Sequence, residues 1–287
     1  MIRLSVNVLT SCLALLKRLD VYRFSSITEL AYSKIAAICA EDLYNFSAKC
    51  GWVIESDSNL GLSERGSQLV AMYNKGLHSE MKCNMLMDYI IKAEPIWSKR
   101  IPYGRREATI FMSKDEQSCF LDAGLLSENP NEKVVEWWDI AAHQIRILAD
   151  QEKKDTGRAG EINTIKYEKA RTETEPLWMS VDSNMAGYDV KSIVTKGDTD
   201  PLLIEVKATY QSLDVASFYI SSNEWRVAQT SLAYVFHLWS FCDDQKMLAV
   251  ISPHEVLPYI PTNNLEGKWE SARIPYACFK EKFVGIK

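Results

Sequence analysis

The chain has 287 residues, of which 47% are hydrophobic and 25% charged, and its net charge is −5. This is an ordinary globular composition with room for two domains. Its acidity argues against a non-specific polycation for nucleic acid, although a local basic patch is compatible with it. The seven cysteines form no CxxC pair and the four histidines are dispersed, which favours free thiols in a reducing compartment over a structural zinc site. No run reaches the ~18 apolar residues of a membrane span, so a cytoplasmic protein without a membrane partner is expected.

The first part of the chain is predicted to be mostly helical. Apolar residues at helical spacing predict helices over residues 6–19 and 27–50. A short strand over 52–56 then leads to a turn, and Ser63 is suited to cap a helix over 62–73.

This order of helices and a hairpin resembles a winged helix-turn-helix over about residues 10–75, which would imply DNA binding. The candidate recognition helix, within residues 33–50, is poor in Arg and Lys. A packing or dimerisation module therefore fits the pattern equally well.

Residues 98–107, SKRIPYGRRE, form an irregular basic stretch in a region that otherwise reads as helical. Its cations are Lys99, Arg100, Arg105 and Arg106. They are candidate contacts for nucleic-acid phosphates, and a solvated loop is the alternative.

A long amphipathic helix is expected over residues 132–155, with Trp137, Trp138 and His143 assigned to a core or domain interface. Its charged end, QEKKD, is typical of a linker or a helix end. This places a domain boundary that separates residues 1–151 from residues 152–287.

The second part is predicted to be an α+β or α/β unit with one mixed sheet flanked by helices, in the order α-β-β-β-α-β-β. The expected helices cover 157–173 and 221–232, and the expected strands cover 177–182, 186–194, 201–210, 233–241 and 246–252.

Charged residues interrupt two of these aliphatic strands. Since side chains alternate along a strand, Glu205 and Lys207 share one face while Ile204 and Val206 share the other. A hairpin through KGDTDP would bring Asp189 next to Glu205. Two carboxylates so close repel each other unless they share a divalent cation such as Mg²⁺ or Mn²⁺. The alternative is a simple Glu–Lys pair on a half-exposed strand.

The order Glu…Asp…Glu-x-Lys resembles the PD-(D/E)XK nucleases, whose core is α-β-β-β-α-β, with Tyr188-Asp189 in place of the usual Pro-Asp. Four blocks narrow the resemblance: GRAGEINTIKYEKAR, GYDVKS, LLIEVKAT and FYISSNEWRVAQ…YVFHLW. In order and spacing they are similar to the NO VEIN C-terminal family, a branch of the restriction-endonuclease-like fold, over about residues 157–252.

The resemblance implies roles for the strand residues. Asp189 and Glu205 would be ligands of Mg²⁺ or Mn²⁺, with the Val206 carbonyl as a third oxygen. Lys207 would orient or activate the attacking water, or stabilise charge in the transition state.

The resemblance also implies roles for residues on the two helices. Glu161 would complete the metal shell, and Glu224, or Asn223 beside it, would touch the site or a backbone phosphate. Each has a simpler alternative: Glu161 suits the positive end of a helix, and Glu224 suits a helix cap.

The function implied by the resemblance is a metal-dependent DNA endonuclease of a restriction or phage-defence system. The resemblance also implies a helicase, ATPase or methylase working beside it. Any energy-driven step would need another chain, because this sequence carries no P-loop. Cutting both strands would suggest a homodimer. The alternatives are a catalytically silent nucleic-acid-binding or scaffold subunit, and a winged-helix transcription regulator.

Overall fold

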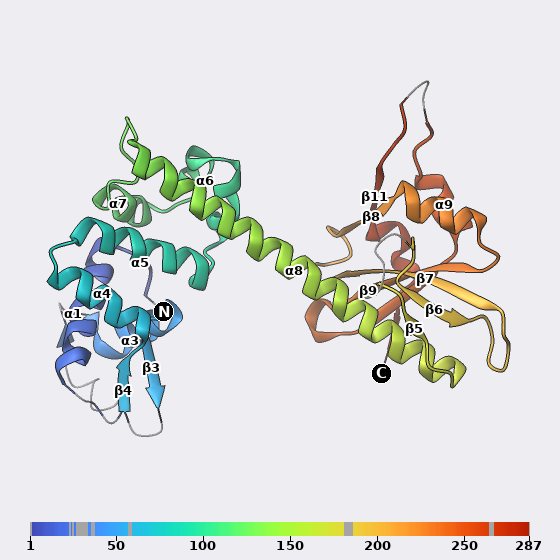
Figure 1. Ribbon diagram of the computed structural model, residues 1–287, viewed down its shortest axis with the longest axis horizontal. Helices are drawn as coiled ribbons and strands as arrows, with labels where there is room; N and C mark the ends of the chain where they lie inside the picture. Colours follow the sequence, from blue (N-terminus) through green and yellow to red (C-terminus); the bar gives the residue numbers. More distant parts are fainter. Residues whose placement is uncertain are drawn as a thin grey trace. The chain divides into compact units, whose positions relative to one another are not determined.

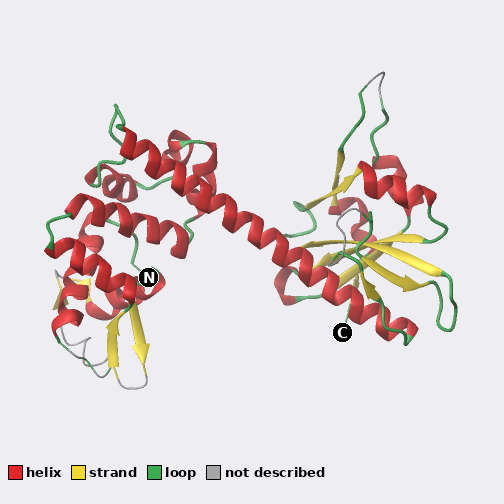
Figure 2. Cartoon of the chain, viewed as in Figure 1, coloured by secondary structure: helices red, strands yellow, loops and turns green. Residues whose placement is uncertain are grey.

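The computed structural model divides the chain into two compact units, Met1–Ala149 and Asp150–Lys287. The predicted class is confirmed: a mainly helical first unit is followed by a unit built on a mixed sheet (Figure 2). Among the described residues, no helix is both long and apolar enough to cross a membrane. The structure describes residues 2–22, 24, 26, 34–35, 38–56, 59–180, 186–263 and 267–286.

The first unit packs helices around α1, which contacts α3, α4 and α7 and contributes buried leucines to the core. Helices α1, α3 and α4 lie close together in this unit (Figure 1). Its helices are α1 (Val6–Val21), α3 (Ala40–Lys49), α4 (Glu64–Asn74), α5 (His78–Ala93), η1 (Ile96–Tyr103), α6 (Arg105–Ile110), α7 (Lys114–Asp122) and the start of α8 (Glu132–Thr172). Two antiparallel strand pairs accompany them: β1 (Lys34–Ile35) with β2 (Ile38–Cys39), and β3 (Val53–Ser56) with β4 (Asn59–Leu62).

The helix predicted over residues 27–50 is wrong for its described first part. Ile35 and Ile38 pair across a short hairpin, and helix α3 begins only at Ala40. Isoleucines at this spacing suit a strand pair as well as a helix, whereas Glu41 and Asp42 favour a helix start because its N-terminus is partially positive.

The β3–β4 hairpin and the cap of α4 are as predicted, since the Gly66 N–H donates to Ser63 Oγ at 3.0 Å. Residues 27–33 and 36–37, which belong to the proposed winged helix, lie outside the described residues. The winged-helix resemblance therefore stays a prediction.

Helix α8 runs without interruption through the expected linker, which corrects the prediction of a helix end at QEKKD. The boundary between the two units falls within this helix. Its charged residues form contacts one turn apart: Lys153 pairs with Asp150 at 3.7 Å, and Gln151 donates to Asp155 at 2.8 Å. Such pairs support a solvated helix. A charged run thus marks the unit boundary here without breaking the helix.

The second unit is built on a six-stranded sheet in the order β12-β10-β9-β7-β6-β5. Strands β5, β6 and β7 are consecutive and antiparallel, and α9 then connects to β9, which is parallel to β7. An unpredicted strand, β8, precedes α9 and pairs with β11 in a separate ribbon. The elements are β5 (Leu177–Trp178), β6 (Val190–Ile193), β7 (Pro201–Thr209), β8 (Ser217–Ser221), α9 (Ser222–Thr230), β9 (Tyr234–Ser240), η2 (Cys242–Asp244), β10 (Met247–Ile251), α10 (Pro253–Val256), η3 (Leu257–Tyr259), β11 (Ser271–Pro275), η4 (Tyr276–Lys282) and β12 (Val284–Gly285).

Strand β7 is covered on both faces, so the alternative of a Glu–Lys pair on a half-exposed strand is wrong. Ile204 and Val206 belong to a core cluster that residues of α8 share. Helix α8 passes over the sheet of this unit (Figure 1). On the other face, Leu203 packs against a second cluster that includes Trp225 of α9. Glu205 lies on this second face and is only 4% exposed. Its charge therefore has to be balanced from within the protein.

Polar contacts fix α8 on the sheet. Trp239 Nε1 donates to Thr164 Oγ1 at 2.8 Å. Arg171 donates to the carbonyl oxygens of Ile193 and Val194 at 2.6 and 2.7 Å, and it also forms a two-pronged bond with buried Glu168. These bonds tie the end of β6 to the helix, so the strand that follows Asp189 has a fixed position.

Two glycines of α8 provide a matched test of this packing. A Cβ on Gly160 would lie 2.8 Å from Ala208 Cβ and 3.0 Å from Val206 Cγ1, whereas one on Gly157 would meet nothing within 4 Å. We expect Gly160→Ala to destabilise the second unit by roughly 1–3 kcal/mol through overpacking. Gly157→Ala should stabilise it by up to ~1 kcal/mol, because Ala favours a helix. Denaturant unfolding of both variants checks this, and equal effects would contradict the close packing.

Candidate functional site

Asp189 and Glu205 lie opposite each other on adjacent antiparallel segments. Val190 of β6 pairs with Ile204 of β7, so Asp189, one residue before β6, faces Glu205. The Asp189 N–H donates to the Ile204 carbonyl at 2.9 Å, and the Val206 N–H donates to Asp189 Oδ2 at 2.9 Å. These backbone bonds hold the first carboxyl group beside the second.

Neither carboxyl group is well solvated. Burial raises the pKa of Asp189 to about 6, although the Val206 N–H and the Lys207 charge act to lower it. Burial also raises the pKa of Glu205 well above its ordinary value, against the effect of Lys207 and with a further rise from the Asp189 charge. The pair therefore holds protons that an ordinary Asp and Glu would have released at the same pH.

Lys207 lies between two carboxylates. Its Nζ donates to Glu205 Oε1 at 2.6 Å and to Glu224 Oε1 at 3.1 Å. Burial acts to lower the pKa of Lys207, but Glu205 and Glu224 outweigh it and the pKa is raised. The ammonium therefore stays charged beside Glu205.

Glu224 both caps helix α9 and holds Lys207. The Ser221 N–H donates to Glu224 Oε2 at 2.7 Å, and the Glu224 N–H donates to Ser221 Oγ at 3.2 Å. Burial acts to raise the pKa of Glu224, but Lys207 and the Ser221 N–H reverse this and the pKa is lowered. The cap predicted for this residue is present, and the same carboxylate also reaches the site.

Glu161 lies in α8 and is engaged by three donors. Its Oε2 accepts from Trp178 Nε1, from Ser180 Oγ at 2.6 Å and from Arg158 at 3.0 Å. Its charge also acts to raise the pKa of Asp189, so it is close to the pair. These contacts anchor the β5 segment to α8, and the predicted role of Glu161 as a metal ligand stays a prediction.

The donor set suits a small hard cation with few protein ligands. Among the described residues, no three His, Cys, Asp or Glu side chains group as a metal centre requires, so Glu161 does not join Asp189 and Glu205 in such a cluster. The N–H and C=O of one strand residue point to the same side, so the Val206 carbonyl faces the Asp189 segment. Two carboxylates and one carbonyl fit Mg²⁺, which keeps several waters in its shell.

Two residues that were not predicted from the sequence, Gly187 and Tyr234, shape the turn before Asp189. Gly187 has φ +77°, and a Cβ there would lie 2.7 Å from Val227 Cγ2 of α9. The Tyr234 hydroxyl donates to the Gly187 carbonyl at 2.8 Å from β9. The glycine directly before Tyr-Asp was a signal for this tight turn, whereas nothing local marks Tyr234.

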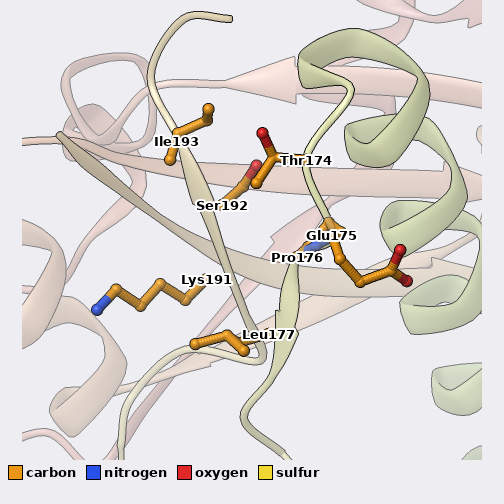
Figure 3. A pocket seen from close by; sticks show the side chains of 7 residues that line it. All are labelled: Thr174, Glu175, Pro176, Leu177, Lys191, Ser192 and Ile193. Carbon is orange, nitrogen blue, oxygen red and sulfur yellow. The ribbon is translucent and has the colours of Figure 1, made fainter. Parts of the chain in front are cut away.

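The carboxyl pair does not lie in the cavity that opens along β5 and β6. That cavity has a volume of about 150 Å³, and its lining includes Leu177, Lys191 and Ile193 (Figure 3). Asp189, Glu205 and Lys207 do not line it. The site is instead a cluster of side chains where β6 begins, between α8 and α9.

The four basic residues of the stretch 98–107 lie in two elements, η1 and α6, and have different surroundings. Arg105 donates to the Leu125 and Ser127 carbonyls at 3.4 and 3.2 Å, and the Arg100 guanidinium lies 5.0 Å from the centre of the Phe111 ring. Lys99 and Arg106 are exposed. Arg105 and Arg100 therefore make contacts within the first unit, and the predicted role of the stretch in nucleic-acid binding stays a prediction.

Trp137 and Trp138 belong to the core of the first unit, as predicted, whereas His143, which was assigned to the core or a domain interface with them, is exposed. Trp138 is buried and stacks on Phe120, and Trp137 packs edge-on against the same ring.

The fold and the site together define a mixed α/β unit with two poorly solvated carboxyl groups and a charged lysine at one end of its central strands. Residues 160–250 match the family model described as Protein NO VEIN, C-terminal, which confirms the predicted family resemblance for this segment. The matched segment contains Glu161, Asp189, Glu205, Lys207 and Glu224. No curated protein and no solved structure matches the chain.

The raised pKa of Asp189 predicts a pH dependence of stability. An unfolded Asp has a pKa of ~3.9, so the folded state binds this proton more tightly, and its contribution is complete below about pH 4 and lost as the pH rises through 6. In EDTA, Asp189→Asn should flatten this loss and be more stable than the parent at pH 7 by about 2–3 kcal/mol. Asp198→Asn is the control, because hydrogen bonds from the Asp200 and Thr199 N–H groups lower the pKa of that exposed carboxyl. Parallel stability curves for the parent and Asp189→Asn would contradict the assignment.

A second prediction concerns the basic stretch of the first unit. Replacing Lys99, Arg100, Arg105 and Arg106 together by alanine should weaken nucleic-acid binding and flatten its salt dependence, because fewer counterions are released. Since Arg105 and Arg100 also make contacts within the first unit, Arg106→Ala is the cleaner single test. Binding measured across a salt series checks both, and an unchanged slope would assign this stretch to a solvated surface.

Proposed function

We propose that the second unit is a divalent-cation-dependent nuclease that hydrolyses phosphodiester bonds in DNA. The observation that carries this proposal is the Asp189–Glu205 pair, two carboxyl groups held together at a cost in solvation with a charged lysine beside them. A structural role for the pair alone would not require such a cost, and a hydrophobic pair would pack there more favourably.

In this proposal, the residues of the site have separate roles in phosphodiester hydrolysis. Asp189, Glu205 and the Val206 carbonyl would hold Mg²⁺ or Mn²⁺, which supplies charge for the phosphate oxygens and a more acidic bound water. Lys207 would orient the attacking water or stabilise the charge that develops on the phosphorus oxygens. Glu224 fixes the Lys207 ammonium, and Ser221 fixes Glu224.

The biological setting belongs to the same proposal and rests on the family resemblance. We expect a restriction or phage-defence role, with a helicase, ATPase or methylase on another chain. A homodimer would allow both strands to be cut. The first unit would bind DNA or a partner through its exposed basic residues.

A catalytically silent nucleic-acid-binding or scaffold subunit is the second candidate. The observation that favours it is the arrangement of Lys207, which already forms ion pairs with both Glu205 and Glu224 without a metal ion. In that case the three residues would form a buried ion-pair network that only holds α9 to β7.

Substitution of Lys207 separates the two candidates. Lys207→Ala removes no oxygen ligand, so Mn²⁺ should still bind, while nicking of plasmid DNA should fall by roughly a hundredfold or more. Asp189→Ala should lose both metal binding and nicking. Nicking rate, Mn²⁺ affinity and thermal stability are to be measured on the same preparations.

Stability needs its own control, because Lys207→Ala leaves Glu205 buried without its partner, a loss of about 3–5 kcal/mol for buried pairs. Lys207→Gln keeps a hydrogen-bond donor at the position and should fold more readily. A folded Lys207→Gln protein that cuts at the parent's rate would contradict the proposed role of Lys207 in hydrolysis. A parent that binds DNA but never cuts it in Mg²⁺ or Mn²⁺ would favour the silent candidate.

A further inference from the structure

Arg158 is an exposed cation of α8 that pairs with Glu161, a carboxylate whose charge acts to raise the pKa of Asp189. Its guanidinium lies 4.7 Å from the centre of the Trp178 ring, and its Nη1 donates to Glu161 Oε2 at 3.0 Å. The side chain is nevertheless 47% exposed. Stacking on one side and an ion pair on the other restrict its rotamers, while the guanidinium keeps access to solvent.

The segment that holds Arg158 is bonded directly to Asp189. The Met179 and Ser180 N–H groups donate to the Asp189 carbonyl at 2.8 and 3.1 Å. Ser180 Oγ and Trp178 Nε1 both donate to Glu161, the partner of Arg158. The chain from the arginine to the first carboxylate therefore consists of a few short contacts within one unit.

The chemistry of this position suits a phosphate. A guanidinium has five N–H donors, of which the bond to Glu161 uses one, and its flat fork matches two phosphate oxygens. We propose that Arg158 binds a backbone phosphate of the nucleic-acid strand that enters the Asp189–Glu205 site. This inference rests on the proposed function, and it adds a substrate-binding residue and a side of entry along α8 and β5.

The simpler role for Arg158 is to neutralise Glu161. That role predicts a loss of stability on substitution and no effect on nucleic-acid affinity. A phosphate contact predicts a loss of affinity whose size depends on salt, because each phosphate neutralised releases counterions.

The test is the binding of a short fluorescein-labelled DNA duplex in EDTA, measured by anisotropy over a salt series. Arg158→Ala should weaken binding about tenfold and reduce the slope of log K against log salt by about 0.9, the value for one lost phosphate contact. Arg158→Lys should keep the slope but recover only part of the affinity, since it keeps the charge and loses the fork. An RNA duplex of the same sequence tests which backbone is preferred.

Lys280→Ala is the matched control. Lys280 is 53% exposed and, like Arg158, pairs with one carboxylate, in this case Asp214 at 2.8 Å. Glu161, the partner of Arg158, acts to raise the pKa of Asp189, whereas neither Asp214 nor Lys280 is among the groups that shift the pKa of Asp189 or Glu205. Its substitution should leave affinity and slope at the parent's values.

The outcomes separate this inference from the proposed function. If the parent nicks DNA but Arg158→Ala binds with the parent's affinity and slope, Arg158 is only a partner of Glu161 and the inference is wrong. If Arg158→Ala weakens binding but no parent preparation nicks DNA, the inference stands and the nuclease proposal falls. A parent that binds neither duplex overturns the inference directly.

Discussion

The second unit is organised around two carboxyl groups that the fold holds together where water solvates them poorly. Asp189 is fixed by backbone hydrogen bonds to β7, and Glu205 of β7 is buried. Burial raises the pKa of both carboxyl groups. Lys207, held by Glu205 and Glu224, supplies a permanent positive charge that opposes this. The other contacts of the site depend on this balance.

Two helices supply the supports from opposite sides of the sheet. Helix α8 packs closely on β7 at Gly160, and through Glu161 and Arg171 it fixes β5 and β6 around Asp189. Helix α9 contributes the Ser221–Glu224 cap, which also holds Lys207. The Glu224 carboxylate both caps α9 and accepts a hydrogen bond from Lys207 of β7. A change in the position of α9 would therefore move Lys207. The supports are thus rigid elements rather than loops, as a precise site requires.

The sequence predicted much of this site because its signals are local. Alternation along β7 placed Glu205 and Lys207 on one face, the intervening turn predicted the hairpin to Asp189, and S-x-x-E predicted the cap of α9. It did not predict that both faces of β7 are covered, because the covering strands β8 and β11 pair across fifty residues of sequence. The stacking of Arg158 on Trp178 and the bond from Tyr234 to Gly187 are likewise set by tertiary packing. The charged run QEKKD suggested a linker or a helix end, whereas α8 continues through it and packs on β7 at Gly160.

The central claim is that Asp189 and Glu205 are paired to receive a divalent cation. Calorimetric titration with Mn²⁺ at pH 6, repeated in two buffers with different heats of ionisation, tests it most directly, because it counts protons as well as heat. With the pKa of Asp189 at about 6 and that of Glu205 also raised, binding should release about half a proton or more. Binding without proton release, or no binding at ~1 mM Mn²⁺, a weak but ordinary affinity range, would contradict the account.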